Sequence, residues 1–231
     1  MAEFLGEINW SPLWISLKTG VLATVIAFFM GIFFARLAMR LGTVGKGILD
    51  GILTLPLVLP PTVAGFLLLM LFSLKRPLGS FLLEKFDIRI VQTWKGCVIA
   101  ACVIAFPLMY RNARAAFEQV DVNLVYAGRT LGMSERRIFW KVVMPTAAPG
   151  IASGTVLAFA RAIGEYGATS MLAGNILGKT RTVSVAIASE TAAGNFAAAG
   201  FWVVVIVAIS FLVVAVINIV SGKGMKVKRW M

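Results

Sequence analysis

Long runs of uncharged apolar residues alternate with short polar segments along this chain. A helix that crosses the hydrocarbon core of a bilayer needs about 20 apolar residues. The stretch between Asp50 and Lys75 contains 24 residues without a charge, whereas the stretch between Lys95 and Arg111 contains only 15. Long side chains at the ends of the shorter run can reach the interface and extend it. The pattern predicts an all-α bundle of five membrane-spanning helices, at about residues 14–39, 50–74, 96–117, 143–170 and 198–220.

The second predicted span is interrupted by prolines. It reads Leu-Pro-Leu-Val-Leu-Pro-Pro-Thr over residues 55–62, and the adjacent pair is Pro60 and Pro61. Each proline removes a backbone donor and clashes with the preceding helical turn. In lipid, the freed carbonyls need partners in neighbouring helices or in a water-filled cavity. Two interpretations stay open: a packed kink, or a kinked helix that lines a transport pathway.

Composition supports a membrane protein and argues against a nucleic-acid-binding one. Hydrophobic residues make up 59% of the chain and charged residues only 14%, where soluble domains carry about a quarter. The net charge is +12, but the basic residues lie at the ends of the apolar runs rather than along one polar face. Thirteen of them fall on one side of the predicted spans and eight on the other. The positive-inside bias therefore predicts an external N-terminus, a cytoplasmic C-terminus and a cytoplasmic loop at about residues 118–142.

The same composition removes most catalytic and metal-binding classes. The chain has no histidine, and its two cysteines, Cys97 and Cys102, fall on different faces of one apolar run, so we expect no metal site, cofactor or disulfide. Residues 1–10 contain no lysine or arginine, so we expect a retained first span rather than a cleaved signal peptide. A membrane-embedded enzyme would need convergent histidines and carboxylates. An ion-coupled secondary transporter would show broken helices in corresponding positions of two repeats, and this sequence has one broken helix.

The cytoplasmic loop carries the most informative pattern. Residues 121–154 read DVNLVYAGRTLGMSERRIFWKVVMPTAAPGIASG. Asn123 is suited to cap a short helix, Gly132 to end it, and Ser134 to begin a second one. Pro145 then fits the first turn of the next span. An ordinary solvated loop is the alternative, but the alternation of small, apolar and basic residues favours a compact helix–turn–helix that serves as a docking surface.

This loop resembles the coupling loop of the binding-protein-dependent ABC importer permeases. The motif of that family is Glu-Ala-Ala, three residues, Gly, nine residues, Ile, one residue, Leu-Pro. The matching positions here are Tyr126, Ala127, Gly128, Gly132, Val142, Met144 and Pro145. Tyr126 replaces the acidic residue, so a contact that depends on that carboxylate is not expected. The glycine and proline spacing, which sets the helix–turn–helix geometry, is retained.

Other segments are similar to the oxyanion permeases of this family, and to molybdate permeases in particular. They are LPLVLPPTVAGFLLL at residues 55–69, VDVNL…A.RTLG at 120–132 and GTVLAFARAIGEYGAT at 154–169. Sulfate and tungstate permeases share much of this pattern and remain alternatives. The resemblance implies a non-catalytic permease that works by alternating access as a homodimer, with a cytoplasmic ATPase subunit and a periplasmic oxyanion-binding protein. It also implies ATPase contact through Asn123, Tyr126, Ala127, Gly128, Gly132, Arg136, Arg137 and Pro145.

Two charged residues fall inside the fourth predicted span. Arg161 and Glu165 are spaced i, i+4, so they can pair along one helix face. Because charge inside a membrane helix is costly, the pair should face the bundle interior or water. It is either a structural ion pair near the external interface or part of a gate, and in the second hypothesis Thr169, Pro60 and Pro61 contribute to the pathway.

One motif resembles a phosphate-binding loop but does not meet its requirements. Residues 173–180, AGNILGKT, approach the phosphate-binding loop G-x-x-x-x-G-K-[ST], but Ala173 replaces the first glycine and no apolar strand precedes it. We therefore expect no ATP binding here, and we interpret residues 174–197 as an external or re-entrant segment folded against the bundle.

Overall fold

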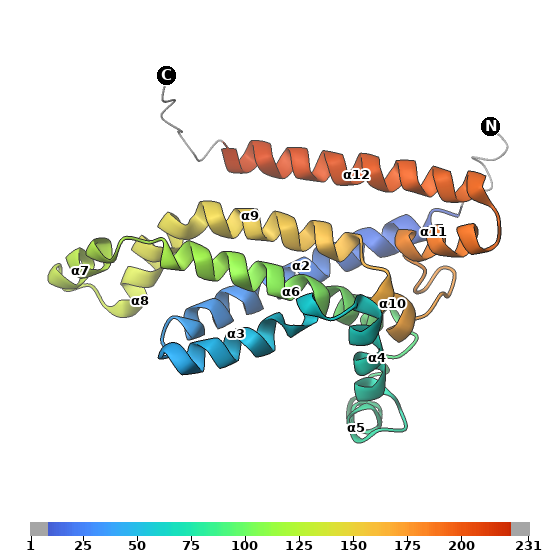
Figure 1. The fold of residues 1–231 in the computed structure, drawn as a ribbon, viewed down its shortest axis with the longest axis horizontal. Coiled ribbons are helices and arrows are strands. Elements are labelled where there is room, and N and C mark those ends of the chain that lie inside the picture. Colours follow the sequence, from blue (N-terminus) through green and yellow to red (C-terminus); the bar gives the residue numbers. More distant parts are fainter. Residues whose placement is uncertain (1–8, 223–231) are drawn as a thin grey trace.

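The computed structural model describes residues 9–222, and every regular element within that range is a helix (Figure 1). This confirms the predicted all-α class. Three long helices form the centre of the bundle: α2 (Ser11–Ala38), α6 (Trp94–Glu118) and α9 (Met144–Ile163). The helix α12 (Phe196–Gly222) runs along one side of this centre. Residues 1–8 and the basic tail at 223–229, which entered the orientation argument, lie outside the described residues.

Small side chains allow the three central helices to approach closely. Ala23, Ala27 and Ala35 on α2 are fully buried, as are Ala105 and Ala113 on α6. In a bilayer, where lipid tails are as apolar as leucine, close backbone approach of this kind is a main source of helix association. The prevalence of alanine in the core follows from that requirement.

The second predicted span is two helices rather than one. α3 (Thr43–Val58) and α4 (Pro61–Phe72) are separated by two residues and bent by 109°. The amide of Leu59 still donates to the Leu55 carbonyl, but Pro60 and Pro61 have no amide hydrogen to continue the ladder. The chain therefore turns at this point, and α4 leads away from the bundle axis to α5 (Pro77–Phe86) (Figure 1).

The fourth predicted span also differs from a single helix at 143–170. It begins earlier, because α8 (Glu135–Ile138), a π-helical turn (Phe139–Val143) and α9 form one continuous helix of 29 residues. It ends earlier, at Gly164, after which the short helix α10 (Gly167–Leu172) follows. Within the described residues, four helices are long and apolar enough to span a membrane, or five if the bent pair counts as one.

The segment predicted at residues 174–197 forms a turn and the short apolar helix α11 (Val183–Ala192), and its last two residues begin α12. The Val183 amide donates to Ser16 Oγ of α2 at 2.7 Å, and α11 also packs against α12. Figure 1 shows that α10 and α11 lie at one end of the bundle, whereas α7 (Val122–Thr130) and α8 lie at the other. The predicted coupling loop and the segment at residues 174–197 therefore lie at opposite ends of α9.

Candidate coupling and pathway sites

The predicted coupling loop is a helix–turn–helix that projects from the bundle. Asp121 caps α7, because its Oδ1 accepts a hydrogen bond from the Asn123 amide at 2.9 Å. The predicted cap, Asn123, is instead the second residue of the helix. Gly132, with a φ of +70°, follows α7 in the left-handed conformation that glycine adopts without strain. Ser134 begins α8, as predicted, and its Oγ accepts from the Arg137 amide at 3.4 Å.

The projecting helices expose apolar side chains, which we call the coupling surface: Val122, Leu124, Tyr126 and Leu131. All four are exposed, and Leu131 is 79% accessible. Arg129 donates to Glu135 at 2.7 Å and lies 5.8 Å from the Tyr126 ring centroid. The hydrogen bond to Glu135, with its negative charge, raises the pKa of the Arg129 guanidinium above its usual value. Exposed apolar residues rimmed by charges are typical of a protein-interaction site.

The coupling surface is firmly attached to the bundle. Gly128 is buried, and a Cβ at that position would lie 3.0 Å from Ile138 Cγ1, so α7 packs closely on α8. Phe139 then contacts Phe117 of α6, with ring centroids 5.7 Å apart, and Arg36 of α2 lies 4.0 Å above its ring. The segment that follows α7 and α8 is therefore packed against two central helices. Phe117, Phe139 and Arg36 were not among the predicted site residues. Arg136, Arg137 and Pro145 are exposed.

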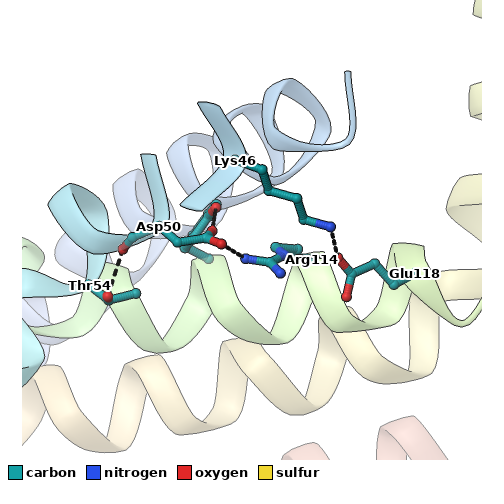
Figure 2. A network of polar contacts seen from close by, with 6 residues as sticks. Lys46, Asp50, Thr54, Arg114 and Glu118 are labelled. Atoms are coloured by element: carbon teal, nitrogen blue, oxygen red, sulfur yellow. Dashed lines mark hydrogen bonds and ion pairs between the residues drawn. The ribbon is translucent and has the colours of Figure 1, made fainter. Parts of the chain in front are cut away.

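A second polar feature, which the sequence analysis missed, joins α3 to α6 (Figure 2). Asp50 of α3 accepts from the buried Tyr110 hydroxyl and pairs with Arg114 of α6. Arg114 also donates to Glu118 at 2.9 Å, and Glu118 pairs with Lys46 of α3. No residue of α3 is fully buried, so this network is its main polar connection to the bundle. The i, i+4 spacing of the charges within each helix was visible in the sequence, but it concerns pairs within one helix and not contacts between two.

The predicted pair Arg161–Glu165 forms, but Glu165 lies just beyond the end of α9. Arg161 Nη1 contacts Glu165 Oε2 at 2.9 Å, and the carboxylate is buried. The other oxygen, Oε1, accepts from the Ala168 amide at 2.7 Å, near the beginning of α10. The Glu165 carboxylate therefore has two partners, the Arg161 guanidinium and a backbone amide at the start of α10.

The other predicted pathway residues lie beside this junction. Gly167 of α10 faces Pro61, and a Cβ there would lie 3.0 Å from Pro61 Cβ. Gly65 of α4 approaches α10 still more closely, since an added Cβ would lie 2.6 Å from Ala168 Cα. Thr169 is buried on α10, and Pro60 precedes α4. The structure thus brings the α3–α4 bend and the α9–α10 junction together.

The comparisons with known proteins agree with this architecture. The family model described as "Binding-protein-dependent transport system inner membrane component" matches residues 23–222. The molybdenum transport system permease protein ModB of Escherichia coli K12 is 46% identical over 79% of this chain and 80% of its own length. ModB of Haemophilus influenzae is 39% identical over 76% of each chain. The sulfate permease CysT of E. coli K12 is 30% identical over 95% of this chain and 83% of its own length.

A solved structure has the same fold. An inward-facing form of the MetNI methionine ABC transporter matches 98% of this chain and 100% of its own, with a TM-score of 0.76 and 15% sequence identity. The family description and the apolar helices together identify a multi-pass inner-membrane protein. The chain belongs to the family of binding-protein-dependent transport system inner membrane components.

Proposed function

We propose that this chain is the membrane-spanning permease subunit of an ATP-driven importer for molybdate. The observation that carries the proposal is its 46% identity, over most of both chains, to a permease named for molybdenum transport. The sulfate permease is more distant, at 30%. Sulfate and tungstate, which are tetrahedral dianions like molybdate, are the alternative cargoes.

In this proposal the chain provides the path, and a separate cytoplasmic ATPase subunit provides the energy. The coupling surface on α7 and α8 supports that division, because its exposed apolar residues offer a docking site for a partner. From there a continuous helix of 29 residues runs to the α9–α10 junction, a distance of about 40 Å at 1.5 Å per residue. Closure of the ATPase can therefore tilt the region around Arg161 and Glu165 and switch access between the two sides.

Two further partners follow from the same proposal. A second copy of the chain completes the path, and a periplasmic oxyanion-binding protein delivers the anion. In the most apolar stretch of α12, within residues 196–215, only 11% of the residues are buried, which leaves apolar surface for lipid or for that second copy. Arg161 is the candidate gating cation, with Glu165 limiting how tightly it holds a passing anion.

Reconstitution tests this function directly. The permease, its ATPase subunit and the binding protein are placed in vesicles, and molybdate uptake is measured with and without ATP. We expect uptake that requires all three components and ATP, with tungstate and sulfate competing in proportion to their affinity for the binding protein. Uptake by the permease alone would overturn the proposal, and stimulation by sulfate-loaded but not molybdate-loaded binding protein would reassign the cargo.

A further inference from the structure

A basic pocket of about 550 Å³ opens at the end of the bundle opposite the coupling surface. It lies between the first part of α2, the segment that precedes α6, and the turn that precedes α11. Its lining residues are Lys18, Arg89, Gln92, Thr93, Trp94, Ile176, Gly178 and Lys179. Three of these are cations and none is a carboxylate, although they come from three separate parts of the sequence.

The three cations are not neutralised by described carboxylates. None of them takes part in the ion pairs that the described residues form. Lys18 Nζ lies 4.9 Å from the centroid of the Trp94 ring. Arg89 donates to the Val91 carbonyl and to Gln92 Oε1, both at 3.3 Å. Convergent unpaired charge on a concave surface raises the local concentration of anions.

Two of the neutral donors around the pocket already have partners. Trp94 Nε1 donates to Thr19 Oγ1 at 2.8 Å, and Thr93 Oγ1 donates to the Ile90 carbonyl at 2.8 Å. An anion in the pocket would therefore be held mainly by exposed cations rather than by a closed shell of fixed donors. Such a site binds weakly and releases readily, as a step along a transport path requires.

The turn that resembled a phosphate-binding loop contributes Ile176, Gly178 and Lys179 to this pocket, and Lys179 is the charged one. The amides of Lys179, Thr180 and Arg181 all donate to the Ile176 carbonyl, at 3.1, 2.9 and 3.1 Å. These donors are directed into the turn, so they form no backbone cradle for a phosphate. Gly178, with a φ of +74°, allows the reversal that brings Lys179 to the rim of the pocket.

We propose that this pocket is an external capture site for a tetrahedral oxyanion dianion, separate from any site deeper in the path. The identity of the cargo rests on the proposed function, but the pocket itself rests on the three cations. A dianion would interact with Lys18, Arg89 and Lys179 together. Because the pocket is open to solvent, its affinity should fall as salt is raised.

Equilibrium dialysis tests the site on the purified complex of permease and ATPase in nanodiscs, without binding protein. Bound molybdate and tungstate are measured by mass spectrometry. We expect the variant Lys18→Gln, Arg89→Gln, Lys179→Gln to bind at least about tenfold more weakly than the wild type, since three attractive charges are removed. The matched control changes three cations that do not line the pocket: Lys75→Gln, Arg76→Gln and Lys85→Gln. It should bind within about twofold of the wild type, because more distant exposed charges are screened.

Several results would overturn the capture site while leaving the proposed function intact. One is a wild-type complex that takes up molybdate from its binding protein but retains none in dialysis. Another is equal loss of binding in the control variant, which would indicate a general effect of net charge. A third is a pocket variant that binds anion normally but loses ATP hydrolysis stimulated by the binding protein, because the pocket would then dock protein carboxylates. Loss of uptake by the wild-type complex would instead contradict the proposed function.

Discussion

The network between α3 and α6 leads to a quantitative prediction about Asp50. Replacing it with alanine removes the acceptor of the Tyr110 hydroxyl and one partner of Arg114. Tyr110 is fully buried, and a buried hydroxyl whose O–H has no acceptor costs about 1–3 kcal/mol. Arg114 keeps Glu118, and its side chain is 25% exposed, so the lost ion pair adds at most about 1 kcal/mol. We expect Asp50→Ala to destabilise the attachment of α3 by about 1–4 kcal/mol in total.

Hydrogen exchange of the α3 amides in detergent or nanodiscs measures this attachment. Because α3 has no fully buried residue, its local opening should dominate exchange. A loss of about 2 kcal/mol corresponds to exchange about 30-fold faster, at 1.4 kcal/mol per factor of ten. The exposed pair Arg129–Glu135 provides a control, and Glu135→Gln should change α3 exchange by less than about twofold, since exposed pairs contribute little.

A second substitution tests the assigned cause. If the orphaned hydroxyl of Tyr110 is the larger part of the cost, Tyr110→Phe should restore stability in the Asp50→Ala background. The double variant should then exchange more slowly in α3 than Asp50→Ala alone, by about tenfold. Unchanged α3 exchange in Asp50→Ala, or a double variant less stable than the single one, would refute the reasoning.

Three further predictions concern the coupling surface, a close helix contact and the buried pair. Leu131→Glu should weaken co-purification of the ATPase subunit by about tenfold, because it places a charge at the most exposed residue of the coupling surface; unchanged co-purification would argue against that site. Gly65→Ala should lower stability in thermal unfolding by about 1–3 kcal/mol through overpacking against α10, whereas Gly51→Ala, which has open space around it, should not. Glu165→Gln should leave the protein folded but reduce uptake by about tenfold or more, because Arg161 would lose the charge that balances it; wild-type uptake in a stably inserted variant would exclude a gating role.

Local signals in the sequence predicted the parts of the fold that depend on local chemistry. The apolar runs predicted the helices. Gly132 and Ser134 predicted the turn between α7 and α8, because Gly132 acts through its own backbone conformation and Ser134 through its own side chain. The prediction of Asn123 as the cap was wrong by two residues, because Asp121 caps α7. Both side chains can accept a backbone amide, and only the start of the helix decides which one does.

Features that join distant segments could not be predicted in the same way. Asp50 and Tyr110 are 60 residues apart, and nothing in either local pattern indicates that they meet. The prolines at residues 60 and 61 predicted a kink, but the bend of 109° depends on where α4 finds a surface to pack against. That surface is α10, whose close approach requires Gly65, so the angle is a property of tertiary packing.

The π-helical turn at Phe139–Val143 sets the rotational phase of the whole span that follows it. The Met144 amide donates to the Phe139 carbonyl, five residues back, so the turn holds about one residue more than an α-helical turn. Each residue advances an α-helix by about 100°, and every side chain from Met144 onward is offset by that amount from an uninterrupted helix. This single widened turn therefore fixes the direction in which the side chains around Arg161 face relative to the side chains of α8.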